Sequence, residues 1–410
     1  MKPRLLIVLT GTVGSGGAFH QTHTTLQSLI NGLKDVFDVR VVDVDLGFTA
    51  LLESFVQGDR LPSGNIVEFE RAPKSLRDRI HSGRGRILSL VRNVLGIPYV
   101  HWFAHQIDKR DEDLVYFASQ SELAARISKP YVWTLWDICH IDSPEFDEVR
   151  ANGEFERRDK SIWTSVRKAA LVIVDSTKSV VSVSHSFGVP EEKLIPVPFS
   201  PSPHISASVS NPAEVGSSLR NLPEPYFYYP AQFWGAKNHG RVLDAVAILV
   251  NRGFSGGVVF SGNDRGSLEE VRQRASQRGL GDRVRILTYV SDEELQMLFQ
   301  NAAGLVMASY FGPTNIPPLE AMALGVPVVA SAIHREQLGQ AALLFDPDSE
   351  SDLANKLEEV LIPEVAKRLV ARGQEHIFQI DQNREAQEAL VRNRMIRIAK
   401  RISGLQWSEI

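Results

Sequence analysis

The sequence predicts an α/β protein of two Rossmann-like domains, each with a doubly wound parallel sheet. Its 410 residues exceed the roughly 250–300 residues that one hydrophobic core usually organises. Apolar runs of about four to eight residues alternate with helix-like segments, and these runs are apolar on both faces, as parallel strands covered by helices are. The alternation starts again at Tyr226, after a stretch rich in serine and proline.

The first domain is expected at residues 1–200, with strands at 4–10, 39–44, 114–118, 131–137 and 171–175 and a helix at 22–33. Residues 201–218 have hardly any apolar periodicity and predict a linker. The second domain is expected at 219–385, with strands at 226–232, 256–262, 284–290, 303–309 and 327–331. A C-terminal helix at 386–410 would pack on the first domain. Polar stretches at 371–376 and 379–387 are expected to break the helical region that precedes it.

The composition is that of an ordinary soluble globular protein, with 43% hydrophobic and 23% charged residues. A net charge of -4 excludes a generally basic nucleic-acid binder, so no nucleic-acid partner is expected. The single cysteine, Cys139, cannot form an internal disulfide and is expected to be a buried structural thiol. The N-terminal apolar run is too short for a signal peptide or a membrane span. Together these features predict a cytoplasmic protein.

A glycine-rich loop follows the first expected strand, in the sequence TGTVGSGGAFHQTH. Glycines at 11, 14, 16 and 17 would let the backbone approach a ligand closely, and the N-terminus of the next helix favours an anion. The spacing fits neither the dinucleotide-binding fingerprint nor the P-loop. A tight turn without a ligand explains the loop equally well.

Lys237 lies in the sequence PAQFWGAKNHGRVLDAV, just after one expected strand and just before a helix. A cation beside a helix N-terminus is unfavourable unless an anion offsets it, because the helix dipole repels positive charge there. At the carboxyl edge of a parallel sheet, a diphosphate would fit. A solvated surface lysine is the alternative that this motif alone leaves open.

The stretch SYFGPTNIPPLEAMALGVPVVAS, residues 309–331, places one acidic residue near the start of a helix. Two prolines at 317 and 318 fix the chain ahead of it. Gly312 and the Thr314-Asn315 pair leave backbone amides free to face a ligand. Glu320 is expected in the first helical turn, where its carboxylate could accept hydrogen bonds from a vicinal diol such as a ribose. The helix dipole alone would also explain an acid at that position.

This stretch resembles the nucleotide-sugar signature of the family-4-type retaining glycosyltransferases, the glycosyl transferases group 1 with the GT-B fold. The resemblance continues downstream in AALLFDPDSESDLANKL and upstream in VRILTYVSDEELQMLFQNAAGLVMASYFG. The family's phosphate-binding lysine turn is similar to PAQFWGAKNHGRVLDAV. Acceptor-domain segments are similar to TLWDICHIDSPEF and LVIVDSTKSV. The match spans residue 4 to about residue 360 and is strongest in the C-terminal half, and it implies a GT-B fold.

The resemblance also implies which residues hold a nucleotide sugar. Lys237 would bind the diphosphate and Glu320 the ribose hydroxyls, while Gly16 and Gly17 would face the phosphates from the first domain. Further donor contacts are implied for Gln232, Asn238, Gly262, Gly312, Pro313, Thr314, Asn315 and Ile316. Two positions depart from the family pattern, because Gly312 replaces a glutamate that touches the donor sugar and Gln232 replaces an arginine. Phosphate binding would then depend more heavily on Lys237.

The reaction implied is transfer of a sugar from a GDP- or UDP-linked donor to a hydroxyl group, with retention, in bacterial surface polysaccharide or glycolipid assembly. The acceptor would be a glycan or a lipid-linked glycan. A phosphate oxygen would take the acceptor proton, so neither a metal nor a cofactor is expected. Asp137 is the candidate for contacting donor or acceptor hydroxyls, with helix capping as the alternative. His20 is a further candidate for a substrate contact.

Two other functions stay open. A non-hydrolysing nucleotide-sugar epimerase shares the architecture, and it would release no free nucleotide at steady state. A catalytically weak partner subunit, which only holds a nucleotide sugar for another protein, would explain the departures at Gly312 and Gln232.

Three remaining patterns carry weaker signals. Asp43 and Asp45 form a D-x-D pattern, which we interpret as a solvated turn and not as a metal site. His101 and His105 have the spacing of zinc ligands but lack the accompanying glutamate, so surface or core histidines are expected. The basic, partly apolar segment 71–93 predicts peripheral contact with anionic lipid at the inner face of the plasma membrane, with a solvated helical face as the alternative.

Overall fold

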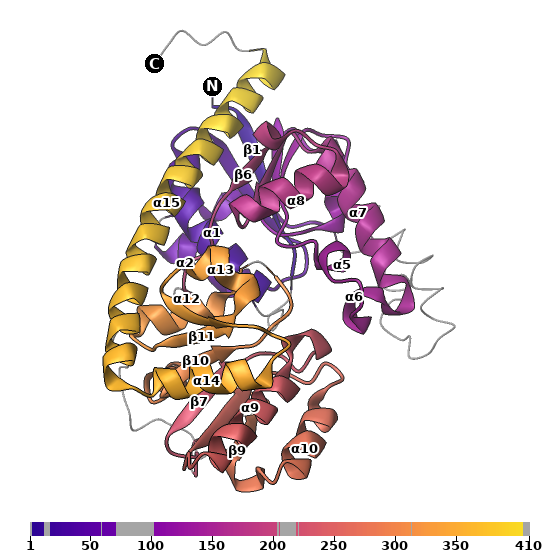
Figure 1. Cartoon of the computed structure of the whole chain (residues 1–410). Coiled ribbons are helices and arrows are strands. Elements are labelled where there is room, and N and C mark those ends of the chain that lie inside the picture. Colours follow the sequence, from indigo (N-terminus) through magenta and orange to yellow (C-terminus); the bar gives the residue numbers. More distant parts are fainter. Residues whose placement is uncertain are drawn as a thin grey trace. The chain divides into compact units, whose positions relative to one another are not determined.

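A computed structural model describes residues 2–11, 17–58, 60–70, 102–202, 205, 219, 221–312 and 314–404. The chain forms two compact units. The first comprises Met1–His140, Ala151–Pro198 and Arg384–Ile410, and the second comprises Ile141–Arg150 and Phe199–Asn383. Each unit contains one six-stranded sheet of parallel strands with helices on its faces (Figure 1). This architecture confirms the predicted class of two Rossmann-like α/β layers.

The sheet of the first unit has the strand order β2-β1-β3-β4-β5-β6. Its strands are β1 (Arg4–Leu9), β2 (Asp38–Asp43), β3 (Leu114–Phe117), β4 (Tyr131–Thr134), β5 (Leu171–Val174) and β6 (Leu194–Pro196). The helices with both ends in the described residues before 190 are α1 (Gly17–Lys34), α2 (Thr49–Gln57), α5 (Cys139–Asp142), α6 (Asp147–Arg150), α7 (Glu154–Lys168) and α8 (Thr177–Phe187), and residues 102–109 are also helical. Residues 5–9 of β1 are wholly buried, so this strand is covered on both faces. Strand β6 was not predicted.

The sheet of the second unit has the order β12-β11-β10-β7-β8-β9. Its strands are β7 (Tyr226–Pro230), β8 (Gly257–Ser261), β9 (Val284–Leu287), β10 (Gly304–Met307), β11 (Val328–Ser331) and β12 (Ala342–Phe345). Its helices are α9 (His239–Asn251), α10 (Leu268–Gln277), α11 (Asp292–Gln300), α12 (Ile316–Ala323), α13 (Arg335–Leu338) and α14 (Glu350–Val360), followed by the first part of α15 (Pro363–Ser403). Strand β12 was not predicted. Short 3-10 turns occur at Ser63–Asn65, Glu122–Ala125, Ala151–Gly153, Glu191–Lys193, Gly235–Lys237, Gly281–Arg283 and Ala332–His334.

The order of strands reverses once in each sheet. In the first sheet the chain moves from β1 to β2 on one side and then returns to β3 on the other side of β1. In the second sheet β8 and β10 lie on opposite sides of β7. Loops that leave the carboxyl ends of strands at such a reversal diverge, and ligands of open α/β sheets bind in the crevice between them. The fold therefore offers one candidate crevice in each unit.

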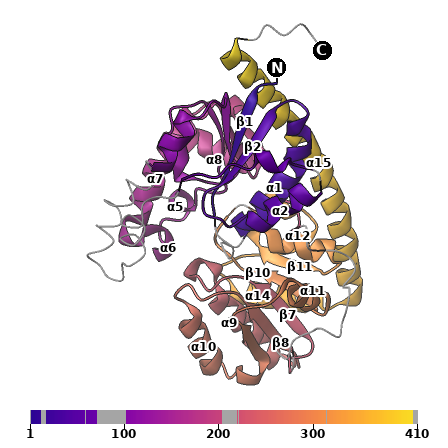
Figure 2. The same ribbon diagram turned by 180° about the vertical axis from the view of Figure 1, so that it is seen from behind.

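The C-terminal helix differs from the prediction. Helix α15 is continuous from Pro363 to Ser403, without breaks at 371–376 or 379–387 (Figure 2). Glutamine, glutamate and arginine are good helix formers, so a polar stretch need not end a helix that keeps a buried face. Val391, Met395 and Ala399 supply that face and belong to the core of the first unit. Among the described residues, none of the helices is both long and apolar enough to span a membrane.

The segment Ile141–Arg150 groups with the second unit, although the sequence around it belongs to the first. The ring of Phe146 packs against Tyr310 and Phe311, with ring centroids 5.4 and 5.2 Å apart. The Glu148 carboxylate accepts a hydrogen bond from the Ala236 amide at 2.7 Å. The boundary expected from the composition of residues 201–218 leaves this segment in the first domain, whereas its contacts group it with the second unit.

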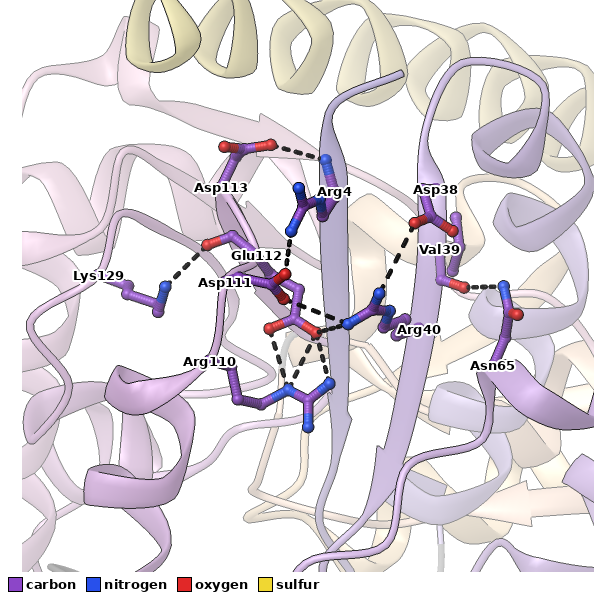
Figure 3. A network of polar contacts seen from close by, with 10 residues as sticks. All are labelled: Arg4, Asp38, Val39, Arg40, Asn65, Arg110, Asp111, Glu112, Asp113 and Lys129. Atoms are coloured by element: carbon purple, nitrogen blue, oxygen red, sulfur yellow. Dashed lines mark hydrogen bonds and ion pairs between the residues drawn. The ribbon is translucent and has the colours of Figure 1, made fainter. Parts of the chain in front are cut away.

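An ionic network ties together the amino ends of β1, β2 and β3 (Figure 3). The Glu112 side chain is buried and accepts hydrogen bonds from Arg110 at 2.7 and 3.0 Å and from Arg40 at 3.3 Å. The Arg4 amide donates to Asp113 at 2.7 Å, and Lys129 donates to the Glu112 carbonyl at 2.8 Å. Both candidate crevices lie at carboxyl ends of strands, so this network lies at the opposite edge of the sheet, and we assign it a role in stabilising the fold.

The substitution Glu112→Gln should lower the free energy of unfolding by about 1–3 kcal/mol, because it removes the charge from hydrogen bonds that Arg110 and Arg40 make to a buried group. Urea denaturation at neutral pH measures this loss. Asp111→Asn is the matched control, because Asp111 is 61% exposed and an exposed ion pair contributes below about 1 kcal/mol. Equal stability of Glu112→Gln and the unsubstituted protein would contradict the role assigned to the network.

Candidate active site

Lys237 stands at the strand-order reversal of the second sheet. It ends the short turn Gly235–Lys237 that connects β7 to α9. Its Nζ atom lies 3.2 Å from Ser309 Oγ and 3.4 Å from Asn315 Oδ1, both on the loop that follows β10. The Tyr229 hydroxyl donates a hydrogen bond to the Lys237 carbonyl at 2.7 Å and fixes the turn. The ammonium group is thus held between the two loops at the reversal, which argues against a freely solvated surface lysine.

The loop between β10 and α12 is held by a residue that the sequence did not indicate. The Gln337 side chain accepts a hydrogen bond from the Asn315 amide at 2.9 Å and donates one to the Asn315 carbonyl at 2.6 Å. The Asn315 side chain in turn donates to the Phe311 carbonyl at 3.2 Å. Gly312 has a φ of +76°, a conformation that side chains rarely adopt. This loop is therefore a defined turn that presents Asn315 to Lys237.

Glu320 is buried on α12, with 5% of its surface exposed. The helix begins at Ile316, so Glu320 lies in its second turn. The prediction that placed Glu320 in the first turn is therefore wrong. The helix dipole acts mainly on the first turn, so it does not explain this acid. The Ser202 hydroxyl donates a hydrogen bond to Glu320 Oε1. Burial raises the pKa of Glu320 to about 7, although the hydrogen bonds from Ser202 oppose the shift.

Other predicted donor residues surround the turn before α9. The Gln232 side chain accepts a hydrogen bond from the Trp234 indole at 2.8 Å. The Asn238 side-chain amide donates a hydrogen bond to the Pro347 carbonyl at 3.0 Å, so it contacts the protein backbone in this structure. Gly262 packs so closely against Ala231 that a Cβ atom would lie 2.3 Å from the Ala231 carbonyl oxygen. Gly262 therefore has a structural reason to be glycine, whatever it binds.

Asp137 belongs to the first unit, in the loop after β4. Its carboxylate accepts a hydrogen bond from the Cys139 amide at 3.0 Å, so it caps the short helix α5, and it pairs with Arg158 of α7. Burial would raise the pKa of Asp137, but the Arg158 guanidinium and the Cys139 hydrogen bonds hold it below its usual range. Cys139 is buried, as predicted. Burial and the neighbouring Arg158 lower the pKa of His140, which keeps its imidazole neutral.

The remaining predicted residues fall in three groups. Gly17 is the first residue of α1, and His20 lies one turn later on that helix. Thr314 and Ile316 flank Asn315, and Ile316 is buried. Gly16, Pro313, His101 and the basic segment 71–93 lie outside the described residues. The structure thus brings Lys237 close to Asn315, on the loop that leads into the helix of Glu320, and it places Asp137 in the other unit.

The D-x-D pattern has a structural explanation. Asp43 Oδ2 accepts a hydrogen bond from the Phe48 amide at 2.7 Å, and Asp45 Oδ2 accepts one from the Gly11 amide at 2.9 Å. Burial raises the pKa of Asp43, and the Phe48 amide opposes that shift. In the described part of the chain, no group of three or more histidine, cysteine or acidic residues is arranged to hold a metal.

Comparison with known proteins shows which family part of the chain is similar to. Residues 211–376 match the model of the family described as glycosyl transferases group 1. The O-antigen chain mannosyltransferase B of Escherichia coli is 27% identical over 280 residues, which cover 65% of this chain and 71% of the relative. The family match thus lies within the second unit, Phe199–Asn383.

The fold of the chain also agrees with solved structures. Anabaena HepE, solved in complex with UDP, has a TM-score of 0.61 at 20% identity, over 98% of this chain and 100% of HepE. WaaG, described as a glycosyltransferase involved in lipopolysaccharide biosynthesis, has a TM-score of 0.65 at 14% identity, over 98% of this chain and 100% of WaaG. These two likenesses show the GT-B fold, and they confirm the fold that the sequence resemblance implied.

Proposed function

We propose that this protein is a glycosyltransferase, which transfers a mannosyl residue from a GDP- or UDP-linked donor to a hydroxyl group of a glycan or a lipid-linked glycan, with retention of anomeric configuration. The observation that carries the proposal is the position of Lys237, held by Ser309 and Asn315 at the reversal point of the second sheet. The mannosyl group is suggested by the E. coli relative, whose name gives a mannosyltransferase of the O-antigen chain. A place in bacterial surface polysaccharide assembly follows from the same relative.

Lys237 would bind the diphosphate of the donor. Its partners Ser309 and Asn315 offer neutral oxygen atoms, so neither neutralises the ammonium charge. The N-terminus of α9 begins two residues later and adds a positive potential. An anion at this place would be attracted by both. The helix N-terminus and the lysine together therefore favour a diphosphate over an uncharged ligand.

Glu320 would bind the ribose of the donor. A buried carboxyl group at the same edge of the sheet can accept hydrogen bonds from two vicinal hydroxyl groups, once it is ionised. In the present structure Ser202 donates a hydroxyl hydrogen bond to this carboxyl group, which shows that a hydroxyl can reach it. A ribose would replace Ser202 or share Glu320 with it.

In the proposed reaction the bond between the anomeric carbon and the phosphate oxygen breaks while a bond to the acceptor oxygen forms on the same face. The acceptor proton passes to an oxygen of the leaving diphosphate, so atoms and charges balance without a protein base. Negative charge grows on the diphosphate in the transition state, and a preorganised cation beside it lowers the barrier. We propose that Lys237 supplies this cation and that no metal is required. A cytoplasmic location and membrane contact through 71–93 stay predictions.

A thermal-shift screen with GDP, UDP, GDP-mannose and UDP-glucose tests the donor class. A ligand at about 100 times its dissociation constant should stabilise the protein by ~2.7 kcal/mol, which is readily seen as a rise in Tm. Release of free nucleotide during turnover would separate a transferase from an epimerase. Binding without turnover of any donor would favour the partner-subunit function. If none of the four ligands raises the Tm, the donor-binding assignment is wrong.

A further inference from the structure

The turn Gly235–Lys237 is not capped by the residues next to it. In the described part of the chain, the side chain of Trp234 does not cap this turn, and that of Asn238 does not cap α9, which follows directly. The first amides of a helical turn have no partner within the turn, and a polar side chain just ahead of it usually accepts hydrogen bonds from them. The turn that carries Lys237 therefore depends on a partner from elsewhere.

Glu148 supplies this partner from a distant part of the sequence. Its Oε1 atom accepts the hydrogen bond of the Ala236 amide at 2.7 Å, across 88 residues of sequence. Both carboxylate oxygens lie close to the backbone of the turn, because a Cβ atom on Gly235 would be 3.6 and 3.8 Å from them. The Ala236 carbonyl in turn accepts a hydrogen bond from the Tyr310 amide at 2.8 Å. The residue before Lys237 is thus held at both its amide and its carbonyl.

Phe146, from the same segment, packs against the second loop that holds Lys237. Its ring centroid lies 5.4 Å from that of Tyr310 and 5.2 Å from that of Phe311. The Phe311 backbone fixes the Ser309 hydroxyl, because the Phe311 amide donates to Ser309 Oγ at 3.0 Å and Oγ donates to the Phe311 carbonyl at 3.1 Å. Ser309 Oγ lies 3.2 Å from Lys237 Nζ. One short segment therefore contacts both the turn that carries the Lys237 backbone and the loop that receives its ammonium group.

We infer that the segment Ile141–Arg150 positions the ammonium group of Lys237, with Glu148 as the main positioning residue and Phe146 as its support. The inference rests on the proposed function, in which Lys237 meets the leaving diphosphate. A cation lowers the barrier when it already lies where charge develops, and a misplacement of about 1 Å can cost about 10²-fold in rate. Glu148 acts through the Ala236 amide and needs no contact with substrate.

Amide hydrogen exchange tests the contact without any assumption about the reaction. In Glu148→Ala, a peptide covering residues 234–238 should exchange faster than in the unsubstituted protein, because the Ala236 amide loses its partner. In Glu148→Gln the exchange should stay nearly unchanged, since the side-chain amide oxygen can accept the same hydrogen bond. Glu145→Ala is the matched control and should have no effect, because Glu145 is an exposed acidic residue of the same segment.

Turnover of GDP-mannose or UDP-glucose tests the consequence for the reaction. Glu148→Ala should lower kcat about tenfold and change the KM of the donor much less, because the charge that Lys237 meets is greatest in the transition state. Glu148→Gln should keep most of the rate. Glu148→Asp should lose as much as Glu148→Ala, because it keeps the charge but is one methylene group too short to reach Ala236. A higher rate for glutamine than for aspartate identifies a positioning hydrogen bond and not an effect of charge.

A double-mutant cycle with Lys237→Ala shows whether Glu148 acts through Lys237. Glu148→Ala should lower the rate of the unsubstituted protein and have almost no further effect in Lys237→Ala, since the group that it positions is gone. A residue that only supports the fold would lower the rate by the same factor in both backgrounds. Urea denaturation of each variant measures any loss of stability separately.

Three results would overturn the inference while the donor proposal stands. The first is an unchanged rate in Glu148→Ala when Lys237→Ala has lost its activity, and the second is an equal loss in both backgrounds of the cycle. The third is tighter binding of GDP or UDP by Glu148→Ala, which would mean that the Glu148 carboxylate occupies the place of the diphosphate. An unchanged rate in Lys237→Ala would instead contradict both the proposed mechanism and this inference.

Discussion

Lys237→Ala should lower the rate of the proposed sugar transfer about 10²- to 10³-fold, the loss that usually follows removal of one preorganised group that stabilises transition-state charge. The physical reason is the position of the ammonium group between Ser309 and Asn315, where it would meet the leaving diphosphate. Turnover of GDP-mannose or UDP-glucose, followed by release of the nucleoside diphosphate, measures this effect. Lys237→Arg should recover only part of the rate, because a planar guanidinium group does not fit where an ammonium group does.

Lys356→Ala is the matched control for Lys237→Ala. Lys356 lies on α14 of the same unit and forms an ion pair with Glu359 at 2.9 Å, away from the loops that follow β7 and β10. Its removal should leave turnover unchanged and stability nearly unchanged. If Lys237→Ala and Lys356→Ala both turn over at the rate of the unsubstituted protein, other residues stabilise the leaving group and the proposed mechanism is wrong.

The substitution Glu320→Gln should remove a pH dependence of stability between about pH 4.5 and pH 7. Burial raises the pKa of the native Glu320 to about 7 from an ordinary value of 4.5. The native state therefore keeps a proton that the unfolded chain loses, and its contribution to stability, full below about pH 4.5, disappears as the pH rises through 7. Glutamine does not titrate. Urea denaturation at pH 4.5, 6 and 8 should show the variant more stable than the unsubstituted protein at pH 8 and equal to it at pH 4.5.

Donor binding should follow the opposite trend, because only the ionised Glu320 offers all its lone pairs to the ribose hydroxyls. Affinity for GDP-mannose should fall as the pH drops below about 7, by up to tenfold per unit. A sugar nucleotide is the right ligand, since a free nucleoside diphosphate has a terminal phosphate that titrates in the same range. Glu320→Gln should bind weakly at every pH. A slope that persists unchanged in Glu320→Gln would mean that another group is titrating.

Among the residues of the proposed donor site, those that the sequence could predict have a local signal. Lys237 and Glu320 each follow an expected strand and residues that interrupt the apolar pattern. A charged side chain at such a position can be recognised as unusual from the sequence itself. Ser202, Glu148 and Gln337 give no such signal, because each meets its partner across the fold. Ser202 contacts Glu320 at a separation of 118 residues, and Glu148 contacts Ala236 at 88. Gln337 holds Asn315 at 22 residues.

The candidate crevice of the first unit, a cavity of about 510 Å³, was harder to foresee. Trp133 sits inside an apolar strand run, YVWT, where a large aromatic residue indicates core packing. Only the structure shows that Trp133 lines a cavity and that its buried indole nitrogen lacks a hydrogen-bond partner. Asp137 was foreseen as a polar residue at the end of this strand, but its partner Arg158 lies 21 residues later, on α7. Pairing of this kind depends on how helix and sheet pack, which one sequence does not reveal.

The backbone at Gly312 limits which residues can occupy this position. Its φ of +76° would strain any residue with a side chain by roughly 1–2 kcal/mol. A Cβ atom there would also lie 3.1 Å from the Thr314 carbonyl oxygen. A single substitution of Gly312 by glutamate, the residue that the family resemblance places at this position, would therefore strain the loop unless neighbouring residues moved as well. Any sugar contact that such a glutamate could make would come at a cost in stability.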